Sequence, residues 1–473
     1  MQALKQLFDR IIQRANINLR ELDFDVSPFV THLIPLDHWG KFYATYGISS
    51  RHALHLQIKH ASLPGSYILG KCRVQNALIY KSDIRGDELK KKGDRFTYGA
   101  FDIPIFEDEG FDIQDSLLIK TLVHNCSSDP ETLERFFITN TIATHFANIH
   151  GSPVDGSFLG PFATIDLTTT SDCVIGPFAY IQANEIGHLN IEPGTVWIKK
   201  PGMFEFTYRY PQERLNRYIT LKAGQAPQGV FIDFIEDRNA DFQRFFETVD
   251  FAASVSVPGT AALDLFSVVK PDTHIGENVL VAERAYLENS RLGKGANAQE
   301  NCYIINSTLA GNNVTAHGGK IIEADLGTNV FVGFNSFLRG QSTSRLTIGQ
   351  DSIIMPHTII DSASPLTIPP GHLVWGLIND PVDLEAHTMS LADFSKIDGR
   401  LQKGNLLFEG SGADFVGAFQ QRIAHILEAN GAFFDGKQQN GHAQNNRNIS
   451  FNLIQHYPEG KSAGLCPRIT IKP

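Results

Sequence analysis

The sequence has few cysteines, and none of them lies in a metal-binding or disulfide pattern. The 473 residues contain five cysteines, an odd number, with no CxxC pair. They are Cys72, Cys126, Cys173, Cys302 and Cys466. Scattered cysteines of this kind are typical of reduced thiols in a cytoplasmic protein, and they provide no zinc motif.

Long apolar runs and an excess of positive charge are also missing. No uninterrupted apolar stretch approaches the ~20 residues of a membrane span. The first residues, MQALKQLFDR, lack the apolar core of a signal peptide and carry an early acid. Lys and Arg number 41 against 51 Asp and Glu, so the net charge is −10 and the pI is about 5.9. This balance disfavours a nucleic-acid or anionic-membrane partner.

Familiar catalytic signatures are absent as well. The sequence has no GxGxxG followed by a helix, no Walker A motif, no HExxH and no GxSxG. Any catalytic hypothesis therefore rests on isolated residues. What the chain does contain is a hydrophobic content of 42%, enough for a substantial core, and a clear internal repeat.

The repeat consists of an aliphatic residue followed by a small one, every 17 residues. It comprises Ile275-Gly276, Leu292-Gly293, Leu309-Ala310 and Leu326-Gly327. A further pair, Ile348-Gly349, follows after 22 residues, as a coil with a short insertion requires. A fixed period in this range is typical of a solenoid.

The interior of one repeat predicts a three-sided coil. In the first unit, Ile275, Val281 and Leu287 are six residues apart, which gives one inward aliphatic residue for each of three short strands. Asparagine and glycine tolerate positive φ and suit the corners between strands. The corner candidates are Asn278, Gly295, Asn297, Gly311, Asn312 and Asn313. Because one coil cannot bury its apolar side alone, the coils are expected to stack.

Three segments resemble a known family. LGPFAT at 159–164, IGPFAY at 175–180 and IPPGHLVWG at 368–376 are similar to the motifs of hexapeptide-repeat transferases. The resemblance implies a left-handed parallel β-helix, a homotrimer with sites shared between neighbouring rods, and acyl-CoA as the donor of an acyl group. Residues 1–150 do not resemble the nucleotide-binding domain of sugar-nucleotide pyrophosphorylases that carry such a β-helix.

Composition and periodicity divide the chain into seven segments. They are a helical capping segment (1–65), a possible first coil (66–89), a helical insertion (90–157), coils (158–198), an aromatic-rich insertion (199–256), further coils (257–379) and a mixed α/β extension with a helix (380–473).

Four helices and a hairpin are expected outside the coils. The N-terminal helix has Leu4, Leu7, Phe8, Ile11 and Ile12 on one face. A second helix is predicted from a cap at Asp129 to Gly151. The others are predicted at 233–251 and 414–430, and a short hairpin at 449–458 with 468–473.

His317, in GNNVTAHGGKII, is the preferred catalytic candidate. The resemblance implies a histidine that removes a proton from an acceptor hydroxyl or amine, and imidazole titrates near neutral pH. The backbone N–H groups of Gly318 and Gly319 could stabilise a thioester oxyanion, and Lys320 could pair with a phosphate or carboxylate. The structural alternative is that His317 only caps a corner.

Other residues are candidates for a second base and for donor contacts. His357 is the alternative base. Candidate binding residues are Asn335, Arg339, Gly340 and Gly376, with Gly349 as another close-approach point. Arg339 and Arg345 could reach CoA phosphates or could simply be solvated. Trp375 could stack on a ring, although a lid over the last coil is the favoured interpretation.

The favoured function is acyl transfer from acyl-CoA to a hydroxyl or amine of a small molecule, possibly a sugar or nucleotide-sugar. Tyr208, Arg209 and Tyr210 could shape an acceptor pocket, or pack the insertion. One alternative is a non-catalytic scaffold. Another is a γ-carbonic-anhydrase-like enzyme, because His145 and His150 have that family's five-residue spacing. However, these two histidines fall on the predicted helix. The histidines within the coils are too dispersed to match; they are His274, His317, His357 and His372. We therefore expect no metal.

Overall fold

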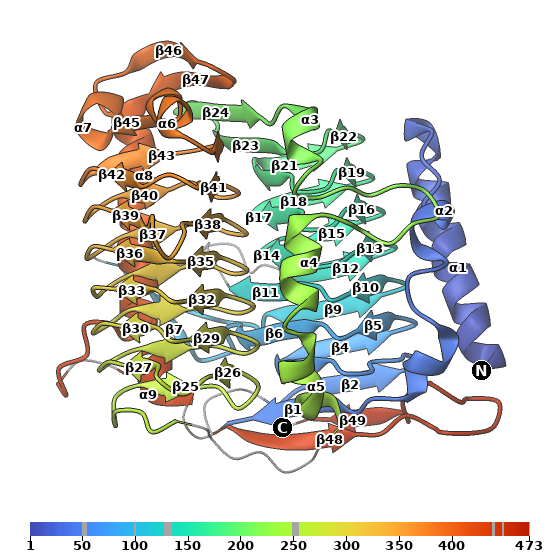
Figure 1. Ribbon diagram of the computed structural model, residues 1–473. Helices are drawn as coiled ribbons and strands as arrows, with labels where there is room; N and C mark the ends of the chain where they lie inside the picture. Colours follow the sequence, from blue (N-terminus) through green and yellow to red (C-terminus); the bar gives the residue numbers. More distant parts are fainter. Residues whose placement is uncertain are drawn as a thin grey trace. The chain divides into compact units, whose positions relative to one another are not determined.

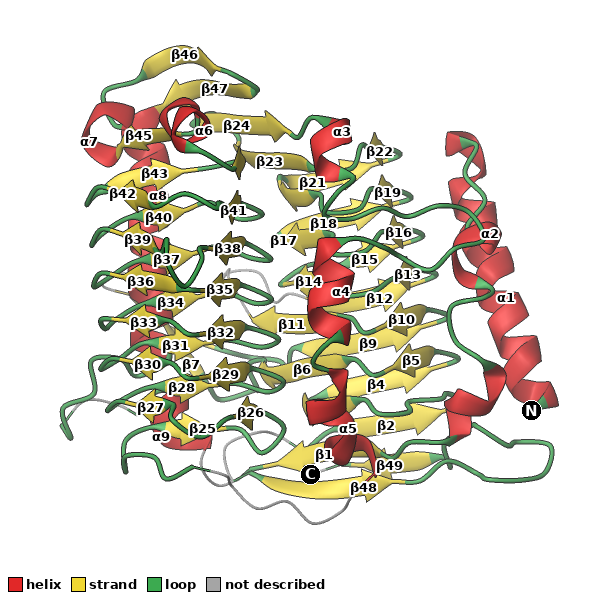
Figure 2. Cartoon of the chain, viewed as in Figure 1, coloured by secondary structure: helices red, strands yellow, loops and turns green. Residues whose placement is uncertain are grey.

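The computed structural model describes residues 1–49, 54–98, 101–126, 135–247, 255–437, 440–446 and 449–472. The chain forms two compact units. Unit 1 comprises Met1–Thr195, Gln212–Asp237 and Ile449–Pro473, and unit 2 comprises Val196–Pro211 and Arg238–Asn448. Figures 1 and 2 show that short strands dominate both units, with few helices.

Unit 1 is a stack of three-sided coils, because consecutive strands visit three parallel sheets in turn. The first sheet contains β1 (Ala44–Ile48), β3 (Tyr67–Gly70), β6 (Asp83–Glu88), β11 (Leu122–Cys126), β14 (Asn148–His150), β17 (Thr164–Asp166) and β20 (Tyr180–Gln182). The second contains β2 (Leu56–Lys59), β4 (Cys72–Gln75), β9 (Gly110–Gln114), β12 (Arg135–Thr139), β15 (Val154–Asp155), β18 (Thr168–Ser171) and β21 (Asn184–Gly187). The third contains β5 (Leu78–Tyr80), β10 (Leu117–Ile119), β13 (Ile142–Ala143), β16 (Phe158–Leu159), β19 (Val174–Ile175) and β22 (Asn190–Ile191).

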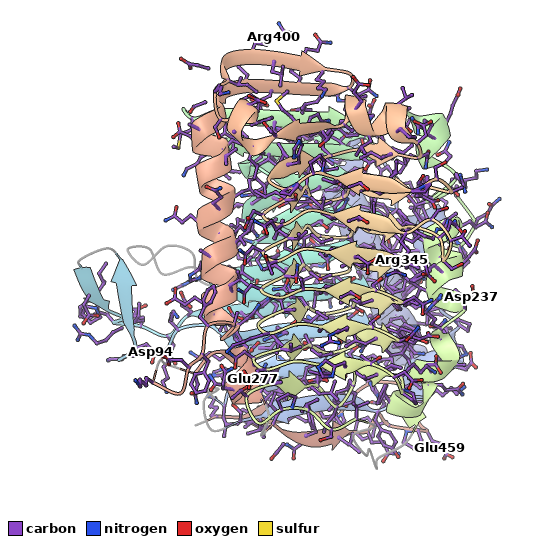
Figure 3. All side chains as sticks on the ribbon, turned by 60° about the vertical axis from the view of Figure 1, so that its left-hand side comes forward. Asp94, Asp237, Glu277, Arg345, Arg400 and Glu459 are labelled. Carbon is purple, nitrogen blue, oxygen red and sulfur yellow. The ribbon has the colours of Figure 1, made fainter. Side chains whose placement is uncertain are left out.

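Several segments of unit 1 lie outside these coils. A hairpin, β7 (Arg95–Tyr98) with β8 (Phe101–Pro104), leaves the stack, and Figure 3 shows it projecting at Asp94. The helices are α1 (Gln2–Asn18), η1 (Leu19–Leu22), α2 (Ser27–Val30), η2 (Leu36–Gly40), α3 (Gln212–Leu215) and α4 (Val230–Glu236). The N-terminal helix is confirmed as α1: it buries Leu4, Leu7, Ile11 and Ile12, as its periodicity predicts, while Phe8 is only half-buried.

Unit 2 repeats the three-sheet arrangement. Its first sheet contains β25 (Ala262–Leu263), β28 (Leu280–Val281), β31 (Asn297–Ala298), β34 (Val314–Thr315), β37 (Phe331–Val332), β40 (Ile353–Ile354), β43 (His372–Val374) and the antiparallel β45 (Thr388–Ser390). The second contains β26 (Val268–Val269), β29 (Tyr286–Glu288), β32 (Tyr303–Ile305), β35 (Lys320–Ile322), β38 (Phe337–Arg339), β41 (Ile359–Asp361) and β44 (Leu377–Ile378). The third contains β27 (His274–Ile275), β30 (Arg291–Leu292), β33 (Thr308–Leu309), β36 (Ala324–Leu326), β39 (Leu346–Ile348) and β42 (Leu366–Ile368).

The remaining elements of unit 2 lie beside or beyond its coils. The strands are β23 (Thr195–Lys200), β24 (Phe204–Arg209), β46 (Asp398–Lys403) and β47 (Leu406–Ser411), and β47 pairs antiparallel with both β24 and β46. The helices are α5 (Asn239–Glu247), α6 (Pro381–Ala386), α7 (Leu391–Phe394), α8 (Gly412–Ala429) and α9 (His442–Asn445). Helix α8, expected at 414–430, runs along the stack, where the Phe419 ring lies 6.4 Å from that of Phe331 (Figure 3).

The 17-residue register is confirmed. Ile275 pairs with Leu292, Leu292 with Leu309, Leu309 with Leu326, and Leu326 with Ile348 across the 22-residue step. These side chains belong to one continuous apolar core within unit 2. Unit 1 uses a shorter coil, because Thr164 pairs with Tyr180 and Phe158 with Val174, in each case 16 residues apart.

The small residue after each aliphatic one is required by a close approach between coils. A Cβ on Gly293 would lie 2.1 Å from the carbonyl oxygen of Ala310. A Cβ on Gly327 or Gly349 would lie 2.6 Å or 2.3 Å from a backbone nitrogen of the following coil. Since all these distances are under 3 Å, the backbone itself excludes larger side chains at this corner.

The corner predictions are confirmed at four positions and wrong at two. Asn278, Gly295, Gly311 and Asn312 have positive φ. Asn297 instead lies in β31, and Asn313 is buried, with its amide side chain bonded to the backbone of Gly311 and Gly327.

The helix predicted from Asp129 to Gly151 is wrong wherever the structure describes it. Asp129 lies outside the described residues, but Arg135–Thr139, Ile142–Ala143 and Asn148–His150 are strands. Phe136 and Ile138 are buried at alternate positions, which is the period of a strand. The apolar residues of this segment also fit the spacing of a helix, so the sequence pattern alone is ambiguous. The coils also begin at β1, before the first coil expected at 66–89.

Two other expectations need correction. The helix at 233–251 is broken into α4 and α5, and residues 248–251 lie outside the described part. The C-terminal hairpin does not form: β48 (Ser450–Ile454) pairs antiparallel with β1, and β49 (Ile469–Ile471) pairs antiparallel with β2. Each strand pairs with the end strand of a multi-stranded sheet, which is more stable than an isolated two-stranded hairpin.

Candidate functional site

His317 lies at a coil corner of unit 2, between β34 and β35. The residue after it, Gly318, has a φ of 72°, a left-handed conformation that glycine adopts without strain. The chain can therefore turn sharply at this point and bring the His317 side chain against the preceding coil.

The same corner position recurs in successive coils and is occupied by charged or aromatic residues. The N–H groups of Asn301, Gly318 and Asn335 donate to the carbonyl oxygens of Glu283, Glu300 and His317 at 3.2, 2.9 and 3.0 Å. Glu283, Glu300, His317 and Phe334 therefore form a column with a 17-residue spacing. We call it the corner column.

His317 and Glu300 form a buried pair within this column. Nδ1 of His317 lies 2.5 Å from Oε2 of Glu300, and the side chains are only 3% and 2% exposed. A carboxylate this close to Nδ1 favours the imidazole tautomer that carries its proton on Nδ1, which is the tautomer that a base acting through Nε2 requires. The Phe334 ring lies 5.2 Å from the imidazole.

Lys320 lies close to the pair in sequence, and its amine is also buried. Nζ donates a hydrogen bond to the carbonyl oxygen of Gly318 at 2.6 Å and lies 5.9 Å from the centre of the Tyr303 ring. Burial lowers the pKa of the Lys320 amine to about 8. A phosphate or carboxylate contact, as the sequence suggested, would require this buried amine to become accessible, since Lys320 is 2% exposed.

The N–H groups of Gly318 and Gly319, predicted to stabilise an oxyanion, both make hydrogen bonds within the fold. The backbone N–H groups of Gly318 and Gly319 donate to the backbone carbonyl oxygens of Glu300 and Ala316, each at 2.9 Å. A Cβ on Gly318 would meet the side-chain oxygen of Asn335 at 2.2 Å, so Asn335 packs against the turn itself. These residues shape the corner.

Cys302 is the one thiol beside this cluster, and it is a core residue. Its Sγ lies 3.1 Å from the carbonyl oxygen of Ala316, and burial raises the pKa of the thiol to about 12. A thiol that is almost never ionised at neutral pH is a poor nucleophile.

His357, the alternative base, occupies a different position on its corner. The backbone N–H of His357 donates to the carbonyl oxygen of Phe334, and its φ is 57°. His357 therefore aligns with Asn335 and Gly318 rather than with His317. Tyr210 donates its hydroxyl proton to the carbonyl oxygen of His357. His274 is exposed on β27, and His372 contacts the Pro370 carbonyl oxygen at 2.9 Å.

Arg339 and Arg345, which the sequence left as CoA contacts or solvated side chains, are both paired with carboxylates. Arg339 makes a bidentate pair with Asp361, at 2.8 and 2.9 Å. Arg345, labelled in Figure 3, bonds to Asp325 and Glu323 and thereby ties the insertion to its coil. To bind a phosphate, either guanidinium would have to break these contacts with carboxylates, and that cost opposes phosphate binding.

The remaining predicted contacts are internal. A Cβ on Gly340 would meet the Glu323 carbonyl oxygen at 2.6 Å, and one on Gly376 would meet the Tyr208 ring at 2.6 Å. Trp375 is buried, which fits the lid interpretation. Tyr208 is also buried and packs against His387 at 5.7 Å, so it belongs to the packing of unit 2.

A second set of titratable residues lies in unit 1, on the first sheet. His124 pairs in register with His150, and His150 with Asp166. Nδ1 of His150 lies 2.8 Å from Asp166, Nε2 of His124 lies 3.0 Å from Glu88, and the two imidazole rings are 5.2 Å apart. Tyr180 donates to Asp166 at 2.5 Å. We call this set the histidine ladder.

Sequence reasoning missed Glu300 and the histidine ladder, although both left a signal. Glu300 precedes His317 by one 17-residue repeat, and His150 precedes Asp166 by one 16-residue repeat of unit 1. The 16-residue relation between His150 and Asp166 was missed because His150 was assigned to the predicted helix. His145, considered with His150 as a zinc pair, instead lies in a turn, where burial holds the pKa of its imidazole well below 6.5.

Comparison with known proteins agrees with this architecture. The family described as "Hexapeptide repeat including loop" matches residues 101–223. A crystal structure of a "putative acetyltransferase" from Desulfovibrio desulfuricans G20 is 49% identical, with a TM-score of 0.93, over 100% of this chain and 99% of that one. The chain therefore belongs to the hexapeptide-repeat transferase superfamily.

Other comparisons add less. A Bacillus cereus protein described in the same words is 13% identical over 36% of this chain and 92% of its own, with a TM-score of 0.18. No curated protein matches the chain. Within the described residues, no helix is both long enough and apolar enough to cross a membrane.

Proposed function

We propose that the protein transfers an acyl group from acyl-CoA to a hydroxyl or amine of a small molecule, possibly a sugar or nucleotide-sugar. In this proposal His317 is the general base and Glu300 is a positioning residue. The observation that carries the proposal is the buried contact of 2.5 Å between Nδ1 of His317 and Oε2 of Glu300.

The proposed step starts from the imidazole tautomer that is protonated on Nδ1. With Nδ1 protonated against Glu300, Nε2 accepts the proton of the acceptor hydroxyl or amine as that group attacks the thioester carbonyl. The new carbon–oxygen or carbon–nitrogen bond forms, the carbon–sulfur bond breaks, and the CoA thiolate leaves with the proton from Nε2. Base catalysis of this kind contributes about 10²–10⁴-fold in rate.

The low exposure of His317 sets a condition on this step. Because the side chain is 3% exposed, neighbouring residues must move before an acceptor reaches Nε2. In the proposal Lys320 is a positioning residue as well: its bond to the Gly318 carbonyl oxygen fixes the corner that holds His317.

The relative from Desulfovibrio desulfuricans supports acetyl-CoA as the first donor to test. Membership in the superfamily supports a homotrimer with sites shared between neighbouring chains. Light scattering coupled to size-exclusion chromatography measures the mass in solution, and a monomer would contradict the trimer.

The direct test measures release of the CoA thiol from acetyl-CoA in the presence of a panel of sugars, nucleotide-sugars and amines. We expect acceptor-dependent release by the wild type and a loss of 10²-fold or more in His317→Ala. Glu300→Gln should lower kcat and shift its pH profile, since an amide cannot hold the imidazole proton in the same way. His274→Ala, which changes an exposed histidine of the same unit, is the matched control.

Full activity in His317→Ala, with His274→Ala also unchanged, would contradict the assigned base. Such a result would direct attention to His150, whose contact with Asp166 offers the same chemistry in unit 1. No thiol release with any acceptor would instead favour a non-catalytic scaffold.

A further inference from the structure

Unit 1 contains an apolar pocket that plays no part in the proposed reaction. It is about 680 Å³ in volume, within the range of about 300–1,000 Å³ of small-molecule sites. Residues from three separate segments line it: the outward side of β16, β19 and β22, the N-terminal segment around α2, and the loop between α3 and α4.

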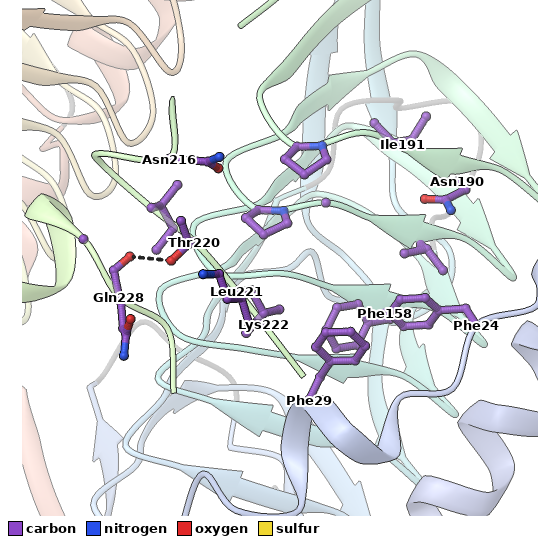
Figure 4. A pocket seen from close by; sticks show the side chains of 16 residues that line it. Phe24, Phe29, Phe158, Asn190, Ile191, Asn216, Thr220, Leu221, Lys222 and Gln228 are labelled. Carbon is purple, nitrogen blue, oxygen red and sulfur yellow. Dashed lines mark hydrogen bonds between the residues drawn. The ribbon is translucent and has the colours of Figure 1, made fainter. Parts of the chain in front are cut away.

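Three phenylalanines form one wall of the pocket. The rings of Phe24 and Phe29 are stacked with centroids 5.3 Å apart, and Phe24 lies 5.1 Å from Phe158 (Figure 4). Phe158 comes from the coil itself, whereas the other two come from the segment that follows α1. The non-repetitive N-terminus thus converts part of a flat sheet face into a cavity.

The opposite wall is the loop 216–229, which is held in place by several backbone contacts. Thr220 and Gln228 exchange backbone hydrogen bonds of 2.8 and 3.1 Å, and the N–H of Gly224 donates to the carbonyl oxygen of Pro28 at 2.7 Å. Gly229 has a φ of 125°, and a Cβ there would lie 2.5 Å from the Tyr218 carbonyl oxygen. The pocket is therefore built into the fold.

The charge of the pocket is one-sided. Among the residues that line it, Lys222 carries the only charge and none is acidic. Lys222 is exposed and has no ion-pair partner among the described residues. Leu221, Ile219, Ile191 and Pro177 add to the apolar lining, while Asn190 and Asn216 supply amides.

We infer that this pocket binds an amphiphile with an apolar body and a single anionic end, such as a medium-chain alkyl carboxylate. The apolar body lies against the phenylalanine wall, and the carboxylate pairs with the Lys222 ammonium. This site belongs to unit 1 alone, and it does not depend on the proposed acyl transfer.

The test is calorimetric titration of the full chain with octanoate, decanoate and dodecanoate below their micellar concentrations. We expect saturable binding that tightens about fourfold per added methylene, as burial of apolar groups requires. Lys222→Gln should weaken decanoate binding roughly twofold to fivefold, as expected for a partly exposed charge pair, and leave decanol binding unchanged. Lys59→Gln, at an exposed lysine on β2, is the matched control.

Leu221→Asp should abolish binding of both decanoate and decanol while its thermal midpoint stays near that of the wild type. Absence of saturation with every carboxylate would overturn the inference. If Lys222→Gln weakens decanoate and decanol binding equally, Lys222 does not pair with an anionic end, and that part of the inference is wrong. If sedimentation shows that Leu221→Asp dissociates an oligomer, the occupant is a second copy of the chain, and the inference is also wrong.

Discussion

The close approach between coils predicts a large cost for a single methyl group at Gly293. In Gly293→Ala, the new Cβ would lie 2.1 Å from the carbonyl oxygen of Ala310 and 2.5 Å from its carbonyl carbon. Both are backbone atoms, so no side chain can rotate away, and the coils must separate. Overpacking of this kind costs about 1–3 kcal/mol.

A matched control is available in the same unit. Gly417 lies on α8, and a Cβ there would have no atom within 4 Å. Gly417→Ala should therefore stabilise unit 2, by up to about 1 kcal/mol, because alanine favours helix more than glycine does. The two substitutions make the same chemical change and differ only in what the methyl group meets.

The assay is differential scanning calorimetry of the wild type and both variants. For a unit of this size, 1 kcal/mol corresponds to roughly 2–4 °C in Tm. Gly293→Ala should lower the Tm by roughly 2–12 °C, and Gly417→Ala should raise it slightly. An unchanged Tm in Gly293→Ala would refute the explanation of the aliphatic-small repeat.

Three further predictions concern packing and buried titratable groups. Leu309→Ala, at a fully buried position of the repeat, should cost about 2–5 kcal/mol, measured as a fall in Tm. Burial lowers the folded-state pKa of Lys320 to about 8, below the 10.5 of a free lysine, so the unfolded chain binds more protons between these values. Stability should therefore rise from pH 8 to 10.5 in the wild type, and Lys320→Met should be more stable at pH 7 and lack this rise. Burial lowers the pKa of His456 to about 4, and its Nε2 accepts the N–H of Leu63 at 2.8 Å. Unfolding should become easier as the pH falls from 6.5 to 4, and His456→Gln should show a flatter pH dependence of Tm.

The repeat could be predicted because it records a backbone constraint directly. Each pair such as Leu292-Gly293 combines an inward side chain with a position where only a small residue fits. The amphipathic helices at α1 and α8 were equally clear, since their apolar faces extend over several turns.

The strands from Arg135 to His150 could not be recognised in the same way. Their apolar residues fit both a helix and three short strands, and only pairing with neighbouring coils decides between them. The C-terminal strands depend on partners about 400 residues away, which no local pattern encodes.

The candidate site was predictable in part. His317 was identified from its corner, and Glu300 follows from the period once both are placed in the corner column. Whether a polar group is already satisfied could not be read from the sequence. The N–H groups of Gly318 and Gly319, and the guanidinium of Arg339, proved to be committed to partners within the fold.

Titration calorimetry with acetyl-CoA, with free CoA as a control, tests the central claim most directly. The account predicts saturable binding by the wild type and a similar Kd in His317→Ala, because the imidazole acts in the transfer step and not in holding the donor. No detectable binding at millimolar acetyl-CoA by a folded sample would contradict the proposal that this protein is an acyl-CoA-dependent transferase.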